Sequence, residues 1–125
     1  MNVLLLRIGG AYCLAFALFH LCFWRIFRWN ADLSRLSEVN RGIMQVLNLC
    51  LTFLFGVFGL LFMLFPGELV ATSPGRFILA STSLFWLARA VEQWIFFKPR
   101  TMISFAFIVI FLCGSGLFFL PLIGE

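Results

Sequence analysis

The sequence predicts an all-α integral membrane protein built as a four-helix transmembrane bundle. The first observation is composition, because 63% of the 125 residues are hydrophobic and only 11% are charged, unlike a soluble domain. The second is four apolar runs, at residues 8–27, 43–65, 77–97 and 102–120. Each is long enough to cross a hydrocarbon core of roughly 30 Å at about 1.5 Å per helical residue. No repeat or linker interrupts the chain, so we expect residues 1–125 to form a single transmembrane domain.

Prolines and small polar residues separate the four runs, as expected where helices end and begin. The breaks fall at Pro66-Gly67, at Ser73-Pro74, which is expected to cap and open the third helix, at Pro99 with Thr101, and at Pro121. Because only residues 98–101 join the last two runs, these helices are predicted to form an antiparallel hairpin. Pro121 is predicted to end the fourth helix.

Basic residues predict the orientation, since cytoplasmic connections carry an excess of Lys and Arg. The two connections rich in them contain Arg25, Arg28, Arg35, Arg41, Lys98 and Arg100. Only Arg7 and Arg76 lie on the other side. Both termini are therefore expected to face away from the cytoplasm of a bacterial inner membrane. The first run has no small-residue cleavage pattern after it, so we expect a retained helix rather than a signal peptide.

The first connection has apolar residues at intervals of three or four, namely Trp29, Leu33, Leu36 and Val39. This spacing is typical of a short interfacial helix, at about residues 30–40, with one apolar face. A solvated connector whose leucines rest on the helix ends fits the same pattern. Both interpretations stay open on the sequence.

The sequence predicts no enzyme, metal site or nucleic-acid partner. The four cysteines lie inside the apolar runs without the spacing of metal ligands or of a C-x-x-C motif. No nucleophile and base, phosphate loop or paired carboxylates stand out. Too little chain lies outside the membrane to build the basic surface that nucleic acid requires.

The third run carries charge where a membrane helix is expected to be apolar. Its ten Leu, Ile, Phe and Val residues favour insertion by roughly 3 to 6 kcal/mol, while Arg89 and Glu92 each cost roughly 2.5 to 3.5 kcal/mol. The i, i+3 spacing allows these two side chains to pair with each other, with Gln93 one turn on from Arg89. We expect this face to turn toward protein rather than lipid.

With the predicted orientation, polar residues of three helices share one depth in the membrane. They form a predicted intramembrane cluster of His20, Asn48, Arg89, Glu92 and Gln93. Arg41 and Gln45 extend it as a stripe to the cytoplasmic interface. Phe16 and Trp24 are expected to flank His20 on one helix face.

The cluster has two interpretations. It can be structural, with hydrogen bonds between helices each worth roughly 0.6 to 2 kcal/mol. It can also mark a path for ions, protons or a ligand, as intramembrane ionisable residues often do. The absence of a second carboxylate for a relay favours the structural interpretation, and His20 is the best candidate for a titrating group.

Three short motifs lie between residues 20 and 97, namely His20-x3-Trp24, Asn40-Arg41-x-Ile43 and Phe85-Trp86-x2-Arg89-x3-Gln93. In these motifs the chain resembles a family of small uncharacterised four-helix bacterial membrane proteins. Family members often carry a histidine where this chain has Leu47, so the resemblance does not imply a function that needs two histidines. It implies the four-helix fold and no particular activity.

The expected role is a non-catalytic subunit or scaffold of a larger membrane assembly, with lipid, other membrane subunits or further copies of the chain as partners. The alternative is a small oligomeric transporter or an ion- or proton-translocating protein that uses His20, Arg89 and Glu92. The sequence predicts no cofactor and leaves quinone, pigment and haem open. Haem would need His20 from two protomers, or Met44 or Met63 as a second axial ligand.

Overall fold

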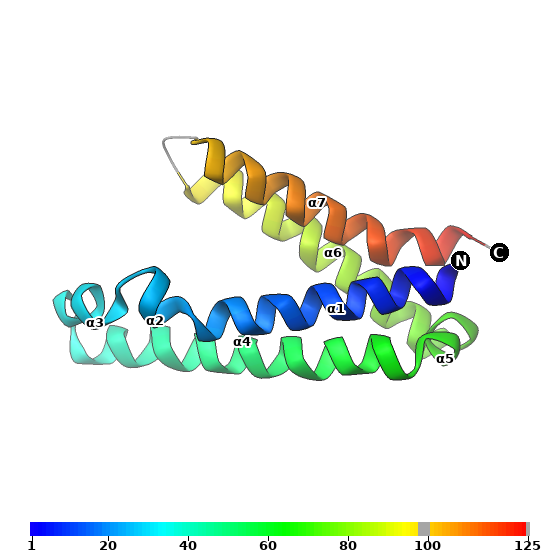
Figure 1. Ribbon diagram of the computed structural model, residues 1–125, viewed down its shortest axis with the longest axis horizontal. Helices are drawn as coiled ribbons and strands as arrows, with labels where there is room; N and C mark the ends of the chain where they lie inside the picture. Colours follow the sequence, from blue (N-terminus) through cyan, green and yellow to red (C-terminus); the bar gives the residue numbers. More distant parts are fainter. Residues whose placement is uncertain (98–100, 125) are drawn as a thin grey trace. The chain divides into compact units, whose positions relative to one another are not determined.

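The computed structural model describes residues 1–97 and 101–124, which form helices and no strand. The all-α class predicted from the sequence is therefore confirmed. Seven α-helices and one 3₁₀ helix follow one another in the described part of the chain (Figure 1). In chain order they are α1 (Asn2–Leu21), α2 (Phe23–Ile26), α3 (Trp29–Asp32), η1 (Leu33–Arg35), α4 (Glu38–Leu64), α5 (Pro66–Ala71), α6 (Ser73–Phe96) and α7 (Met102–Ile123).

Three of these helices, α1, α4 and α7, are long and apolar enough to cross a membrane. Helix α6 corresponds to the third predicted run and has 24 residues, but Arg89, Glu92 and Gln93 make it more polar than the other three. The structure therefore supports a membrane protein with three candidate spans. The four-helix transmembrane bundle stays a prediction at this point.

Several helix ends depart from the sequence prediction. Helix α1 spans Asn2–Leu21 and not residues 8–27, because the chain leaves the helix at Cys22 and α2 follows as a separate element. Helices α4 and α6 begin earlier than predicted, where polar side chains cap them. Helix α4 begins five residues earlier than expected because Ser37 caps it, its Oγ accepting from the backbone N–H of Asn40. Helix α6 also begins early, and its cap is Thr72 rather than Ser73. The Thr72 hydroxyl accepts from the N–H of Gly75, at 3.1 Å, and donates to the carbonyl of Glu68 in α5, at 2.9 Å. Helix α5 itself was not predicted.

The prediction that Pro121 ends the fourth helix was wrong. Helix α7 continues to Ile123 with Pro121 inside it. Proline removes one backbone donor and crowds the carbonyl four residues earlier, but only the last turn of α7 is affected. Separately, Arg76 and Asn2 donate to the carbonyls of Leu122 and Gly124 at this end of the helix.

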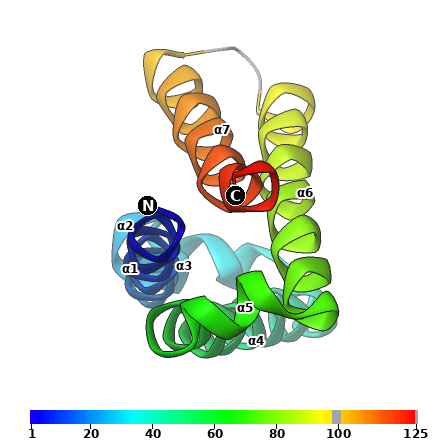
Figure 2. The same ribbon diagram turned by 90° about the vertical axis from the view of Figure 1, so that its right-hand side faces the viewer.

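The described residues divide into two compact units, residues 1–9 with 62–97 and 101–124, and residues 10–61. In the first unit, α6 and α7 run antiparallel and side by side (Figures 1 and 2). Trp86 of α6 stacks on Phe111 of α7 with ring centroids 5.8 Å apart. The last part of α4 also belongs to this unit, and its Phe62 packs on Phe118 of α7 at 4.5 Å. The expected hairpin is present, while residues 98–100 of its connection lie outside the described residues.

The second unit contains most of α1 and α4, which lie antiparallel in contact (Figure 1). Gly59 allows the close approach, because a Cβ atom there would lie 2.7 Å from Leu14 Cγ and 3.0 Å from the carbonyl oxygen of Gly10. Further along, the rings of Phe16 and Phe55 lie 5.9 Å apart. Small residues that let backbones approach are typical of packed membrane helices.

The connection between α1 and α4 is not one helix over residues 30–40. It consists of α2, α3 and η1, then an extended residue, Leu36, before α4 begins. Trp29 and Leu33 of the predicted apolar face are buried, whereas Val39 is 70% exposed because it belongs to the first turn of α4. Trp29, Leu33 and Val39 therefore belong to three separate elements, α3, η1 and α4.

Candidate functional site

Asn48 joins α4 to the end of α1. Helix α1 ends at Leu21, so the carbonyl groups of its last turn lack intrahelical donors. The Asn48 amide, which is buried, donates to the carbonyl oxygen of His20 at 3.0 Å. Its own Oδ1 is buried with no hydrogen-bond partner in the structure. The sequence places Asn48 and His20 in one predicted cluster, and the contact between them is made by the backbone of His20 and not by its ring.

The His20 ring lies among aromatic side chains. Its Nδ1 is 2.7 Å from the carbonyl oxygen of Phe16 and donates to it, since a carbonyl only accepts. The ring stacks on Phe23 of α2, with centroids 4.5 Å apart, and lies 5.2 Å from the ring of Phe55 of α4. Phe23, rather than the expected Trp24, is the stacking partner from the following segment. These contacts hold the imidazole in one orientation.

The predicted stripe on α4 is partly local. Gln45 is half-buried, and its amide donates to the carbonyl of Arg41 one turn earlier, at 3.3 Å. Arg41 is half-buried as well, near the N-terminus of α4. Gln45 therefore donates its hydrogen bond within α4, whereas Asn48, one turn further along, donates to α1.

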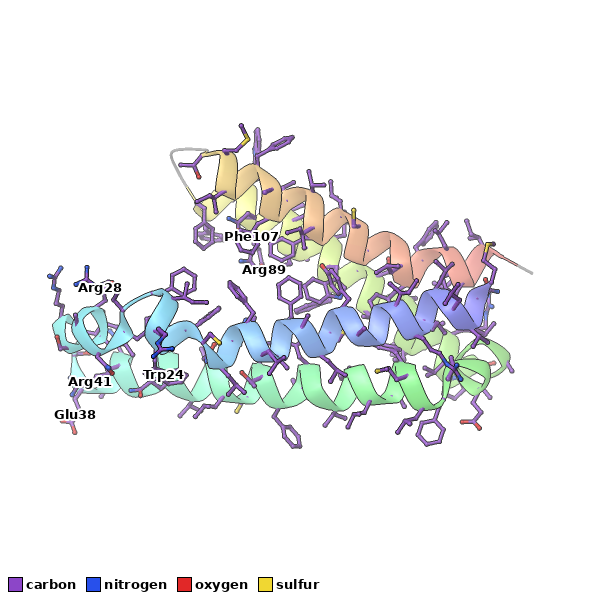
Figure 3. The ribbon with its side chains drawn as sticks, in the orientation of Figure 1. Trp24, Arg28, Glu38, Arg41, Arg89 and Phe107 are labelled. Atoms are coloured by element: carbon purple, nitrogen blue, oxygen red, sulfur yellow. The ribbon has the colours of Figure 1, made fainter. Side chains whose placement is uncertain are left out.

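Arg89 does not form the ion pair expected with Glu92. Its Nη2 donates to Oε1 of Gln93 at 3.1 Å, and its guanidinium carbon lies 4.7 Å from the centroid of the Phe111 ring of α7. A second ring, Phe97 at the end of α6, lies at 5.7 Å. Figure 3 shows the Arg89 side chain at the α6–α7 hairpin. Glu92 is exposed, and the direct contacts of the guanidinium are with aromatic faces and an amide in place of a carboxylate.

Serine residues of α6 and α7 form polar contacts that the sequence reasoning missed. The Gln93 amide donates to Oγ of Ser104 at 3.1 Å, and both residues are buried. Ser83 Oγ donates to the carbonyl of Ser115 at 2.9 Å and lies 3.0 Å from its Oγ. The available signal was the presence of serine inside two apolar runs, on faces that meet in an antiparallel hairpin.

The C-terminal end of α7 receives donors from two other helices. Arg76, in the first turn of α6, donates from Nη2 to the carbonyl of Leu122 at 2.8 Å. Asn2, at the start of α1, donates from Nδ2 to the carbonyl of Gly124 at 3.2 Å. Carbonyl groups at a helix end need such partners. Neither contact follows from sequence spacing, because the partners are 46 and 122 residues apart.

The predicted cluster is thus resolved into two parts. His20 with Asn48 lies in one unit, and Arg89 with Gln93 lies in the other. The union of all five residues in one layer stays a prediction. Within residues 1–97 and 101–124, no group of three His, Cys, Asp or Glu side chains could hold a metal ion. The four cysteines are free thiols, with Cys13 buried and the other three exposed.

Comparison of the chain with protein-family models, with curated proteins and with solved structures finds no match. Function therefore has to be inferred from the contacts of these side chains.

Proposed function

We propose that the chain is a multi-pass protein of the bacterial inner membrane, a four-helix transmembrane bundle that serves as a non-catalytic subunit or scaffold of a larger membrane assembly. The observation that carries the proposal is the use of its polar side chains. Asn48, Arg76 and Asn2 donate to carbonyl groups at the ends of other helices. Gln93 and Ser83 contact serines of the neighbouring helix.

This use of polar groups fits a structural role in lipid. In lipid, apolar contact between helices contributes little free energy to their association. Hydrogen bonds between helices and close packing therefore determine their arrangement. A carbonyl left without a donor in hydrocarbon costs several kcal/mol. Two of the three residues of the alternative ion path support this role: His20 donates to a backbone carbonyl, and Arg89 contacts an amide and an aromatic ring.

The same contacts support α6 as the fourth membrane-spanning helix. Gln93 and Ser83, two of its polar residues, are buried against α7, and Arg89 lies over the Phe111 ring of α7. The cost of inserting α6 falls when these groups have protein partners. Helices α6 and α7 would then enter the membrane together as a hairpin.

The outward faces support association with further protein. Only 22% of the residues in the most apolar stretch of each of α1, α4 and α7 are buried within the chain. Large exposed side chains include Phe53, Phe77 and Phe105. Lipid covers such faces in a monomer, and other subunits cover part of them in an assembly.

Purification from native membranes in a mild detergent, followed by native mass measurement, tests the proposal. We expect a species heavier than the 14.3 kDa chain that contains at least one other membrane protein in fixed proportion. A preparation that holds this chain alone, as monomer or as copies of itself, would contradict the subunit role. Single cysteines at Ser34 and Gly67, in a cysteine-free background, test the orientation: cytoplasmic labelling of Ser34→Cys and protection of Gly67→Cys are expected.

A further inference from the structure

Three exposed arginines occur within the short segment that follows α1. Arg25 belongs to α2, Arg28 separates α2 from α3, and Arg35 ends η1. Asp32 is the only acidic residue between positions 23 and 35, so the segment carries a net charge of +2 from three arginines and one aspartate. If α1 and α4 cross the bilayer, this segment lies at its surface.

Aromatic contacts fasten the segment to the helix end. Trp29 is buried, and its ring lies 5.0 Å from that of Trp24 and 5.5 Å from that of Phe23. Phe27 lies 6.2 Å from Phe19 of α1. Figure 3 shows Trp24 and Arg28 at this end of the α1–α4 pair. The three arginines therefore belong to a segment whose aromatic side chains pack against one another and against α1.

The backbone at Arg28 turns in an unusual way. Arg28 has a φ of 52° in the left-handed region and is the only described residue other than glycine with positive φ. Glycine adopts this conformation without the cost of roughly 1 to 2 kcal/mol that a side chain incurs. The turn buries Trp29 while leaving the Arg28 side chain exposed. An arginine at a position that favours glycine indicates that the exposed guanidinium group of Arg28 has a functional role.

Two exposed apolar side chains lie next to these arginines in the sequence. Ile26 is 51% exposed and Phe27 45% exposed, and they stand between Arg25 and Arg28. A surface that offers both guanidinium groups and apolar side chains matches the boundary between lipid headgroups and acyl chains. An acidic peptide would be matched by the charges but not by the apolar residues.

We infer that residues 23–35 form a binding surface for anionic phospholipid headgroups, with Arg25, Arg28 and Arg35 as the phosphate ligands. Guanidinium groups bind phosphate oxygens through paired N–H donors. Ile26 and Phe27 insert beside the acyl chains of the same lipids. The surface binds phosphatidylglycerol in preference to phosphatidylcholine, which carries no net charge.

Counting bound lipid by native mass spectrometry tests this inference. The purified chain in a non-ionic detergent is titrated with phosphatidylglycerol and, separately, with phosphatidylcholine. Each arginine near an anionic surface contributes about a fivefold factor in affinity. The triple variant Arg25→Gln, Arg28→Gln, Arg35→Gln should therefore bind phosphatidylglycerol on the order of 100-fold more weakly than the parent.

Two further variants separate charge from structure. The triple Lys variant at the same positions keeps the charge and should stay within about fivefold of the parent, because lysine also binds phosphate but without the paired donors. Arg7→Gln removes an exposed arginine from the start of α1 and should leave binding unchanged. Circular dichroism checks that all variants keep their helices. Salt should weaken the parent's binding, which tests the charge dependence even if the Gln variant fails to fold.

Three results would overturn the inference. The first is equal affinity of the parent for phosphatidylglycerol and phosphatidylcholine. The second is unchanged phosphatidylglycerol affinity in a folded Gln variant. The third is complete displacement of phosphatidylglycerol by low millimolar inorganic phosphate or by a short polyglutamate peptide, which would identify a free anion or an acidic protein as the ligand.

Discussion

The side-chain amide of Asn48 on α4 donates a hydrogen bond to the backbone carbonyl of His20 on α1, with 3.0 Å between nitrogen and oxygen. The bond joins two helices at the last turn of α1, where backbone carbonyl groups have no N–H donor within the helix. The bond thus joins two helices through Asn48, one of the polar residues that the sequence predicts to lie within the membrane. Asn2 and Arg76 perform the same task at the end of α7.

Replacing Asn48 by Leu should lower the free energy of unfolding by about 0.6 to 2 kcal/mol, the usual range for hydrogen bonds between membrane helices. Asn48→Asp should cost more than Asn48→Leu at pH 8, because a carboxylate cannot donate and would face a carbonyl oxygen. Gln45→Leu is the control, since Gln45 bonds only within α4, and it should cost less. Unfolding in mild detergent measures all three, and equal losses would argue against the Asn48 bond.

Two glycines of α4 should respond in opposite ways to alanine. A Cβ at Gly59 would meet Leu14 and the Gly10 carbonyl, whereas a Cβ at Gly56 meets nothing within 4 Å. Gly59→Ala should destabilise the chain by about 1 to 3 kcal/mol through overpacking. Gly56→Ala should be neutral or stabilise by up to about 1 kcal/mol, as alanine favours the helix. Thermal unfolding that ranks the two variants alike would mean that α1 and α4 do not approach at Gly59.

Gln93 and Ser104 should be energetically coupled across the α6–α7 hairpin. A double-mutant cycle with Gln93→Leu and Ser104→Ala is expected to give a coupling of about 0.6 to 2 kcal/mol. Thr82→Val with Ser104→Ala is the control cycle, because Thr82 donates to Ile78 within α6. That cycle should be additive within about 0.5 kcal/mol. Coupling of the same size in both cycles would indicate a general loss of packing instead of this bond.

Arg89 and Glu92 test the sequence interpretation against the observed contacts. A direct ion pair predicts that Arg89→Leu destabilises more than the double variant with Glu92→Leu, because the single change leaves a carboxylate alone. The contacts of Arg89 are with Gln93 and Phe111 instead. We therefore expect additive losses, a small effect of Glu92→Gln, and a loss of about 1 kcal/mol or more for Arg89→Lys, since lysine lacks the planar group that stacks on a ring. If Glu92→Leu recovers the stability lost in Arg89→Leu, the interpretation of a direct ion pair between Arg89 and Glu92 would be supported instead.

The sequence predicted the elements better than their partners. The apolar runs predicted four long helices, because a run of this length favours one, but the first run was placed at residues 8–27 and α1 spans Asn2–Leu21. It could not locate the starts of α4 and α6, which depend on the capping side chains of Ser37 and Thr72. It also could not show that Asn48 bonds a carbonyl and not the His20 ring, since the acceptor exists only where α1 ends. Pro121 misled the prediction because a proline near a helix end disturbs only one turn.

The contacts of the serines also could not be predicted from the sequence. Ser83, Ser104 and Ser115 are ordinary in an apolar run, and nothing in their spacing marks them as contacts. Their significance comes from the antiparallel alignment of α6 with α7, a tertiary fact. Arg89 and Glu92, by contrast, drew attention by their charge, yet the contacts of Arg89 are decided by which face meets the rings of α7.

Proton flux through His20 is the most direct test of a structural as opposed to a conducting role. The chain is reconstituted into vesicles that contain a pH-sensitive dye, and the parent is compared with His20→Gln and with protein-free vesicles under an imposed pH gradient. Glutamine can still donate to the Phe16 carbonyl but cannot titrate near neutral pH. A structural role predicts the same slow decay of the gradient in all three samples, with His20→Gln as stable and as helical as the parent. A pH-dependent flux in the parent that disappears in a folded His20→Gln variant would contradict that role and establish proton translocation.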